Sequence, residues 1–334
     1  MKIQRIQIGT HDGVFHADDV FAVAIATEFF VQTRGDDIII DVVRSRDEEK
    51  LNSCNMIFDV GGKYDGNRWF DHHQRGFDET RDGVPFAASG LAWRALGKTL
   101  CGGDQEVADA VDRQLIQSVD AADNGMKLFE GGNPVFEHAR SVSITAAISS
   151  LNPGWQDQSA GAFDSAFEKA VQFARSILKG FVKKALGAKA ARRAFSAAED
   201  ARRRRGDHTV VLEKFVPWTA HVDLVDADAY YVVFPSSSEG WMLQCIPPET
   251  GSFKQRVPLP EGWAGLGAAE LCEVLGISGA TFCHPARFIA GATSKGAAIE
   301  MAEAALAEQL QDERVEAALA LRASFLKLEE DQAG

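Results

Sequence analysis

The hydrophobic pattern of the first 150 residues predicts strands that alternate with helices. Alternating apolar positions over residues 3–8 predict a strand that stops at Gly9-Thr10. Apolar residues at helical spacing follow over residues 18–30, with Asp18 or Asp19 as a natural N-cap. Further strands are predicted at 38–43, 56–60 and 69–70, and helices at 89–96 and 106–120. This alternation predicts a mostly parallel sheet with helices on both faces.

The rest of the chain predicts a long helix and a second set of strands. The helical pattern over residues 163–201 becomes strongly basic toward its end. Strands are then predicted at 209–212, 230–234 and 241–246, and helices at 268–275, at 294–311 and from about 313. We therefore expect an α/β domain over residues 1–160, a helical, basic connector over 161–206 and a smaller C-terminal α+β domain over 207–334.

Length and composition agree with this organisation. The 334 residues suit about two domains, and 46% hydrophobic with 25% charged residues excludes a disordered or fibrous chain. Apolar runs such as residues 20–25 are too short to span a membrane, and the first residues lack the apolar core of a signal peptide. Five scattered cysteines without a CxxC pair indicate a reducing compartment. We therefore expect a cytoplasmic protein.

The net charge of −13 is unevenly distributed along the chain. Residues 1–130 carry 14 Lys and Arg against 23 Asp and Glu, whereas residues 183–205 carry nine against two. So acidic a chain is a poor candidate for coating long nucleic acid by charge alone. The acidic part is instead suited to gathering cations, and the basic part to an anionic partner.

His and Asp residues cluster in four motifs of the first half. They are GTHDGVFHADD over residues 9–19, IFDVGG over 57–62, WFDHHQ over 69–74 and SVDAADNG over 118–125. The first three motifs follow predicted strands, so parallel strands would bring them to one edge of the sheet. Seen singly, each Asp is equally suited to capping a helix or a turn, and each His to packing.

Together these motifs predict a metal site. Carboxylates gathered at one edge would repel one another and raise one another's pKa. One or two divalent cations would remove that cost. Mixed imidazole and carboxylate ligands suit Mn²⁺, Fe²⁺ or Zn²⁺ better than Ca²⁺ or Mg²⁺ alone.

The motifs also resemble a known family. The Asp71-His72-His73 triplet is similar to that of the DHH phosphoesterase superfamily, and GTHDGVFHADD, FDVGGKYD, RWFDHHQRGF, SVDAADNG and FCHPARFIAG resemble the melanocyte-proliferating-gene family. The resemblance covers nearly the whole chain. It implies a DHH-like catalytic domain with a second domain, and a phosphoester hydrolase with two metal ions. We expect these to be two Mn²⁺ ions, with Mg²⁺ or another divalent ion as the alternative. Family members are described as 3′→5′ RNA exonucleases.

The resemblance also implies roles for individual residues. The implied metal ligands are His11, His16, Asp18, Asp59, Asp71, His72 and Asp120, with Asp123 as the alternative to Asp120. Asp59, Asp71, His72 and His73 are the implied catalytic residues. The first motif departs from the superfamily pattern His-x-x-x-Asp-x-Asp, because His16 stands where an Asp is usual and the loop is one residue longer. In that scheme a metal-bound hydroxide attacks the phosphate in line.

The second domain is expected to hold the rest of the substrate. His284 and Arg287, followed by residues 291–295 that open a helix and include Lys295, can make an anion site, and Arg256 is a weaker candidate for the same surface. An ordinary capped turn is the alternative. Trp218, Trp241 and Trp263 could stack on bases or pack in a core, and residues 202–205, all Arg, could contact a polynucleotide or simply face solvent.

Three functions remain open from the sequence. The leading hypothesis is a 3′→5′ exonuclease that acts on short single-stranded RNA or oligonucleotides. The second is a hydrolase of pyrophosphate or another small phosphoester, and the third is a metal-stabilised binding protein without turnover. A homo-oligomer is possible, and no membrane partner is expected. The acidity favours a single-stranded end entering a metal cleft over the coating of a long polynucleotide.

Overall fold

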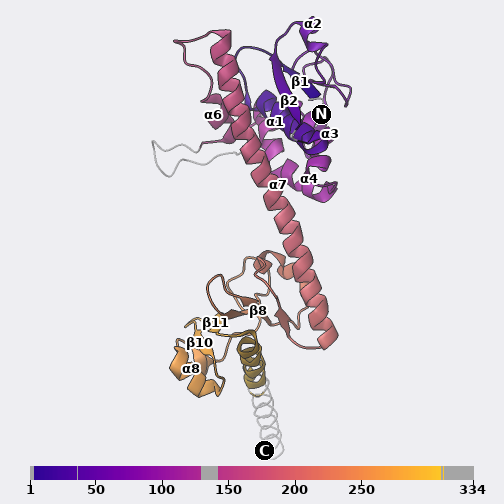
Figure 1. Ribbon diagram of the computed structural model, residues 1–334. Helices are drawn as coiled ribbons and strands as arrows, with labels where there is room; N and C mark the ends of the chain where they lie inside the picture. The colour runs from indigo at the N-terminus through magenta and orange to yellow at the C-terminus, as the bar shows by residue number, and fades with distance from the viewer. Residues whose placement is uncertain (1–3, 36, 129–141, 310, 312–334) are drawn as a thin grey trace, which may run out of the picture. The chain divides into compact units, whose positions relative to one another are not determined.

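The computed structural model describes residues 4–35, 37–128, 142–309 and 311 (Figure 1). The chain divides into two compact units, Met1–Ala188 and Lys189–Gly334. Each unit contains its own sheet and its own hydrophobic core. The two units are described in turn.

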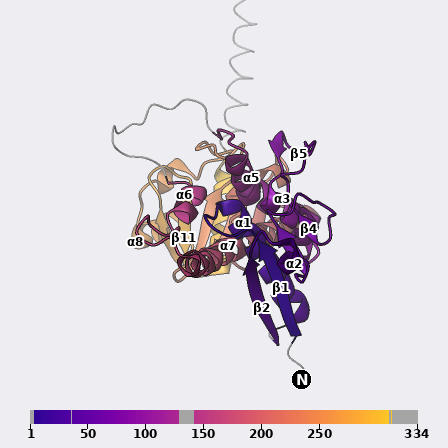
Figure 2. The same cartoon turned by 90° about the horizontal axis from the view of Figure 1, so that it is seen from above.

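The first unit is built on a parallel sheet. Its strands are β1 (Gln4–Thr10), β2 (Ile38–Arg44), β3 (Met56–Phe58) and β4 (Trp69–Phe70), in the order β2-β1-β3-β4. Ile8 aligns with Val42 on one side and with Met56 on the other, and Ile57 aligns with Trp69. Figure 2 shows β1 and β2 lying side by side. Because every pairing is parallel, the carboxyl ends of all four strands meet at one edge.

The two faces of this sheet enter different cores. Phe58 and Phe70 join the main core, whereas Ile57 and Trp69 pack in a smaller cluster on the other face. Gly9 faces this smaller cluster, where an added Cβ would lie 2.9 Å from Leu51 Cδ2. A larger residue at the end of β1 would therefore push this cluster apart.

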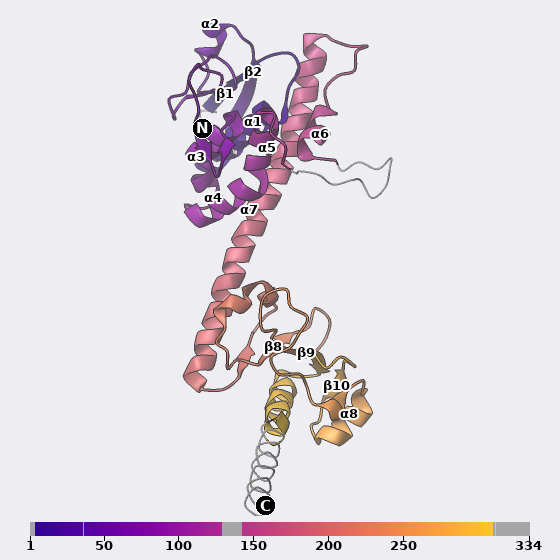
Figure 3. The same cartoon turned by 180° about the vertical axis from the view of Figure 1, so that it is seen from behind.

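Helices surround the sheet. They are α1 (Ala17–Arg34), α2 (Glu48–Leu51), α3 (Ala88–Leu100), α4 (Gln105–Val111), α5 (Gln117–Asp123) and α6 (Ile144–Ser149). Helices α1 and α3 pack against each other in the main core, and Figure 3 shows α3, α4 and α5 close together. The single helix expected over 106–120 is instead α4 and α5 joined by the π-helical turn η1 (Asp112–Ile116). A short hairpin, β5 (Thr80–Arg81) and β6 (Val84–Pro85), precedes α3.

Helix α7 (Ala160–Arg205) contributes to both units. Its N-terminal part places Phe167 and Leu178 in the main core of the first unit. Its C-terminal part places Ala191 and Phe195 in a core of the second unit.

The second unit contains a mixed five-stranded sheet. Its strands are β7 (Thr209–Val211), β8 (Tyr231–Pro235), β9 (Trp241–Cys245), β10 (Ala280–Cys283) and β11 (Ile289–Ala292), in the order β10-β11-β9-β8-β7. Only β7 and β8 pair in parallel. One face packs against α8 (Ala268–Leu275) and the helical residues 295–309, and the other against α7 and the 3₁₀ helix η2 (Trp218–Leu224). A further 3₁₀ turn, η3 (Glu261–Trp263), lies before α8.

The expected fold class is confirmed, since helices flank a parallel sheet in the first unit and a second, α+β unit follows. Strands β10 and β11 were not predicted, because residues 280–292 contain Gly, Pro and small residues that mask the apolar alternation. The helix expected from about residue 313 lies outside the described residues. None of the helices in the described ranges is long and apolar enough to cross a membrane.

Candidate metal centre

Four donor residues lie just beyond the carboxyl ends of the parallel strands. His11 follows β1, Asp59 follows β3, and His72 and His73 come shortly after β4. His11, Asp59 and His73 line a cavity of about 870 Å³, together with Asp123 at the end of α5. The expectation that the strand ends would gather these motifs at one edge is therefore met by the topology.

One cluster consists of His11, Asp19 and Asp59, all three buried. The Nε2 atom of His11 lies 3.3 Å from Asp19 Oδ2 and 3.4 Å from Asp59 Oδ2. Its Nδ1 atom lies 3.0 Å from the carbonyl oxygen of Asp12. When Nδ1–H donates a hydrogen bond to this oxygen, the lone pair of Nε2 is left to bind a cation. Imidazoles that bind metals are commonly oriented in this way.

Two further groups of donors share His72. Asp59, His72 and His73 form one group, and Asp18, His72 and Asp123 form another. The Nε2 atom of His72 lies 3.3 Å from Asp123 Oδ2 and 3.5 Å from Asp59 Oδ1. Asp59 therefore directs one oxygen toward His11 and the other toward His72, which is the position of a bridging ligand.

Buried atoms without partners mark where a cation fits. Asp19 Oδ2, Asp59 Oδ1 and His72 Nε2 are buried and accept or donate no hydrogen bond. Unpaired buried polar atoms are costly, and a cation bound among them would remove that cost. The donor atoms in each group lie within 4.8 Å of one another, so these residues fit divalent cations.

The pKa values show how the charges are balanced without a cation. Burial raises the pKa of Asp19 to about 7 and that of Asp18 well above its usual value. For Asp59, burial would raise the pKa, but the attraction of the nearby His11 and His72 imidazoles outweighs it, and the pKa falls to about 2. Burial lowers the pKa of His72, but the neighbouring carboxylates of Asp123 and Asp59 outweigh this effect and raise the pKa to about 10. Protons thus take the place that a divalent cation would occupy.

The backbone around Asp59 is specialised. Asp59 adopts a left-handed conformation with φ of 55°, which is uncommon for a residue with a side chain. Gly61 follows with φ of 97°, and a Cβ there would lie 2.5 Å from the Trp69 ring. The Asp-x-Gly-Gly motif therefore reflects a turn that aims the carboxylate of Asp59 into the cluster.

Asp71 acts on this turn and on His73. Its Oδ2 atom accepts a 2.5 Å hydrogen bond from the Gly62 amide, and its Oδ1 atom accepts one from the His73 amide. The Nδ1 atom of His73 lies 2.8 Å from the same Oδ1. Asp71 belongs to none of the donor groups formed by the described residues. The structure thus places it beside the cluster, with both oxygens engaged.

Asp18 and Asp120 support the start of α3. The two oxygens of Asp18 accept hydrogen bonds from the amides of Ala88 and Ser89, at 2.9 and 2.6 Å. Asp120 accepts from Ser89 Oγ and the Gly90 amide, and its other oxygen pairs with Arg81 at 2.7 Å. Asp18 nevertheless lies in a donor group, whereas Asp120 does not. Of the two alternatives in the fourth motif, Asp123 is the one that the structure brings to His72.

His16 lies at the edge of the site. It is exposed at the start of α1, and its ring centroid lies 6.3 Å from that of His11. It lines the cavity but joins none of the described donor groups. Arg46 is the only Lys or Arg among the described residues that line this cavity, and it pairs with Asp12 at 3.3 Å.

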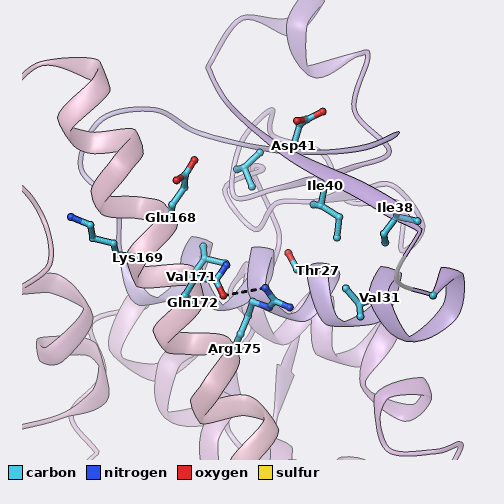
Figure 4. A pocket seen from close by; sticks show the side chains of 12 residues that line it. Thr27, Val31, Ile38, Ile40, Asp41, Glu168, Lys169, Val171, Gln172 and Arg175 are labelled. Carbon is cyan, nitrogen blue, oxygen red and sulfur yellow. Dashed lines mark hydrogen bonds between the residues drawn. The ribbon is translucent and has the colours of Figure 1, made fainter. Parts of the chain in front are cut away.

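A second cavity of the first unit, of about 800 Å³, lacks this chemistry. It is lined by residues of α1, β2 and α7, among them Val31, Ile40 and Val171 (Figure 4). Its Arg175 donates to Gln172 and to Glu28, as the dashed line in Figure 4 shows for the first. None of its described lining residues is His or Cys.

The substrate-binding candidates of the second unit make contacts within the protein. His284 and Arg287 form the turn between β10 and β11, in which the Ala286 amide donates to His284 Nδ1 and Arg287 has φ of 58°. The Arg256 guanidinium donates to the carbonyls of Pro247, Asp226 and Ala229. Lys295 pairs with Glu213. Arg256 and Lys295 therefore already have protein partners.

The tryptophans and the arginine run are largely structural in this fold. Trp218 and Trp263 are buried, and Trp241 is half-buried. Arg202 is 2% exposed and bound to the buried Glu199, while Arg203 pairs with Asp226. Of the four arginines, only Arg204 has no hydrogen bond or ion pair with a described residue.

One donor of the site was not expected from the sequence, and another was expected only as an alternative. Asp19 appears there only as a possible helix cap, although it lies beside Asp18 and eight residues after His11. Asp123 appears only as the alternative to Asp120. The adjacent Asp18-Asp19 pair was the available signal, because a single cap needs only one carboxylate.

The fold and the site define a two-unit α/β protein whose sheet edge carries a carboxylate–imidazole cluster suited to divalent cations. The MYG1_exonuc family profile, described as "Uncharacterised protein family (UPF0160)", matches residues 7–306. MYG1 exonuclease of Homo sapiens is 32% identical over 339 residues, which cover 91% of this chain and 86% of the human protein. MYG1 exonuclease of Rattus norvegicus is 32% identical over 336 residues, which cover 91% of this chain and 85% of the rat protein. No solved structure matches. The chain belongs to the MYG1 exonuclease family.

Proposed function

We propose that this protein is a metal-dependent phosphodiester hydrolase that removes nucleotides from the 3′ end of short single-stranded RNA or oligonucleotides. The observation that carries the proposal is Asp59, whose two oxygens face two separate groups of donors. A carboxylate shared in this way is typical of sites with two metal ions. The exonuclease names of the relatives agree with this chemistry.

Two cation positions follow from the donor groups. His11, Asp19 and Asp59 would hold one cation, and Asp59, His72, Asp123 and Asp18 would hold the other. The mixture of imidazole and carboxylate favours Mn²⁺ over Ca²⁺ or Mg²⁺. When bound, such cations activate water and neutralise the charge that develops on the phosphate oxygens.

The chain's own residues would position the substrate. His73 is 62% exposed, lines the cavity and is held by Asp71, so it can contact a phosphate oxygen without leaving its place. The Asp71 carboxylate would keep the His73 ring in this orientation while a phosphate is bound. In this proposal His73 contacts the substrate and Asp71 positions His73, while other residues bind the cations.

The charge of the cavity favours a phosphodiester over pyrophosphate. Arg46 is the only cationic Lys or Arg among the described lining residues. A diester carries one negative charge per phosphate, whereas pyrophosphate brings several that require more cationic partners. We therefore favour oligonucleotides over pyrophosphate or other small phosphates as the substrate.

A direct assay tests the proposal. The EDTA-treated protein is mixed with Mn²⁺ and with 5′-labelled oligoribonucleotides, oligodeoxynucleotides or pyrophosphate. We expect a ladder that shortens from the 3′ end, and no cleavage without metal. Asp59→Asn should lower the rate by more than about 100-fold, because loss of even an outer partner of a metal ligand costs 10- to 100-fold. Asp78→Asn, an exposed carboxylate of the same unit, is the matched control.

Two results would refute the proposal. One is full activity of Asp59→Asn, and the other is full activity of the metal-free protein. Cleavage of pyrophosphate alone would support the small-phosphoester hydrolase, and metal binding without turnover of any substrate would support a binding protein.

A further inference from the structure

The second unit contains a cavity that the metal centre does not explain. Its volume is about 710 Å³, which is in the range of small-molecule sites. It is lined by residues of β9, η2, the loop after β9 and the β10–β11 turn. The residues used below are Thr219, Gln244, Ser252, Phe253, Lys254 and Phe288.

Two aromatic rings lie on this cavity. Phe253 is 98% exposed, the most exposed of the large hydrophobic residues in the described chain. Phe288 is half-buried, and its ring centroid lies 4.6 Å from that of His284. A single exposed apolar side chain needs no explanation. Two rings on one cavity of this size provide flat surfaces on which a planar ligand can stack.

Gln244 is an unusual residue at this position in the sheet. It occupies β9, a central strand, and aligns with Val232 on one side and Ile289 on the other. Its neighbours Leu243 and Cys245 point into the apolar core, so Gln244 points to the opposite face, where it lines the cavity. Its side-chain amide forms no hydrogen bond with a described residue. An amide offers both a donor and an acceptor, as the edge of a nucleobase does.

Lys254 adds a positive charge to the same cavity. It is exposed and forms no ion pair with the part of the chain that the structure describes. By contrast, Arg256 and Lys295 of the same unit are held by protein oxygens. Lys254 is therefore free to bind a phosphate, and the neighbouring hydroxyls of Thr219 and Ser252 are short polar groups that a sugar can contact.

The walls of the cavity are held in place by the backbone. The Arg256 amide donates to the carbonyl of Ile246, and its guanidinium donates to that of Pro247, so both ends of the loop that carries Phe253 are tied. The Leu259 amide donates to the carbonyl of Arg287, the residue before Phe288. Such a loop loses little entropy when a ligand binds, which favours affinity.

We propose that this cavity binds a nucleotide. The base stacks on the phenylalanine rings, its polar edge meets the Gln244 amide, and its phosphate meets Lys254. The choice of a nucleotide over another planar anion rests on the proposed function. The same chemistry is offered by a free mononucleotide and by the terminal nucleotide of an oligonucleotide.

Binding is measured on the full chain in EDTA, where hydrolysis does not interfere. Isothermal titration with adenosine 5′-monophosphate is compared with ribose 5-phosphate, which lacks the base. We expect Phe253→Ala to weaken binding of the nucleotide by about 5-fold or more, since stacking on an aromatic ring contributes roughly 1–3 kcal/mol. Gln244→Leu and Lys254→Gln should also weaken it. Phe215→Ala, a 60% exposed ring of the same unit outside this cavity, should not.

The results separate this site from the metal centre. Equal affinity for ribose 5-phosphate, or unchanged nucleotide binding in Phe253→Ala and Gln244→Leu, overturns the nucleotide site whatever the hydrolytic activity. Predicted losses of binding in a protein that hydrolyses no oligonucleotide support the site and refute the proposed function. A raised KM for a dinucleotide in Phe253→Ala, with kcat unchanged, supports the site and assigns it to the substrate's end. An unchanged KM beside weakened binding supports it as a site for the free nucleotide.

Discussion

Asp19 offers the sharpest test of the metal centre, because its charge is costly without a cation. Its Oδ1 atom accepts hydrogen bonds from the amides of His16 and Val20, at 2.8 and 3.0 Å. Its Oδ2 atom faces His11 Nε2 at 3.3 Å without a hydrogen bond. In Asp19→Asn the carbonyl oxygen can keep both amide partners, and the new NH₂ group can donate to His11. The substitution therefore preserves the contacts and removes the charge.

The magnitude follows from the pKa of Asp19. Burial raises this pKa from 3.8 to about 7. At 1.36 kcal/mol per pH unit, ionising Asp19 in the metal-free fold costs on the order of 4 kcal/mol. Because the pKa of Asp19 is higher in the folded than in the unfolded protein, protonated Asp19 favours the folded state. This contribution to the free energy of unfolding is fully present below about pH 4 and is lost as the pH rises to about 7. Metal-free Asp19→Asn should lack this loss.

Thermal unfolding in EDTA and in Mn²⁺ measures the effect. At pH 8 in EDTA we expect Asp19→Asn to unfold several degrees above the wild type, since 1 kcal/mol corresponds to about 2–4 °C in a unit of this size. Added Mn²⁺ should stabilise the wild type more than the variant, because Asp19→Asn changes only one of the two proposed cation positions. Asp78→Asn should follow the wild type throughout.

The opposite order would refute this reasoning. If Asp19→Asn is less stable than the wild type in EDTA at pH 8, the carboxylate is not a cost in the metal-free fold. If the variant gains as much stability from Mn²⁺ as the wild type, Asp19 is not a ligand.

Four further substitutions test the surroundings of the site and the second unit. Gly90→Ala places a Cβ 1.8 Å from Asp120 Oδ2 and should cost about 1–3 kcal/mol in urea unfolding. Asp123→Asn should weaken Mn²⁺ binding by more than about 10-fold in a titration, whereas Asp120→Asn should chiefly lower stability in EDTA. Arg202→Ala leaves the buried Glu199 with only a 3.4 Å contact to Arg203 and a 3.3 Å hydrogen bond from the Asp226 amide, which should cost at most about 3–5 kcal/mol in the unfolding of the second unit.

Matched variants separate these effects from unspecific ones. Gly180→Ala, in α7 with nothing near the added Cβ, should stabilise by roughly 0.5–1 kcal/mol. Arg204→Ala, exposed and in the same run as Arg202, should be nearly neutral. A Gly90→Ala variant as stable as the wild type would show that Asp120 is not confined as described. An equal loss of Mn²⁺ affinity in the Asp120 and Asp123 variants would remove the distinction between them.

Much of the first unit was determined by local pattern. Period-two and helical spacing place β1, α1 and β2 within a few residues of their observed bounds. Alternation of strand and helix implies parallel pairing, and parallel pairing brings His11, Asp59 and His72 to one edge. These inferences need only the sequence, because each depends on neighbours in the chain or on a general rule of connection.

Other features depend on contacts between distant segments. Asp18 and Asp19 are adjacent, but the helix turns about 100° per residue, so one faces α3 and the other faces His11. Asp120 and Asp123 lie one helical turn apart on α5. The carboxylate of Asp120 is bound by the N-terminus of α3 and by Arg81, whereas that of Asp123 lies near His72. Strands β10 and β11 form because β9 offers a partner to a segment with weak propensity of its own.

The sequence by itself determined which residue types carry the chemistry and at which ends of strands they stand. Only the tertiary structure decided which carboxylates are free to meet a cation and which are already satisfied by amides and arginines. The physical reason is that a carboxylate has few lone pairs, and packing decides which partner reaches them first. The same applies to Arg202, whose charge in the sequence suggested a partner outside the chain but which is bound to Glu199 within it.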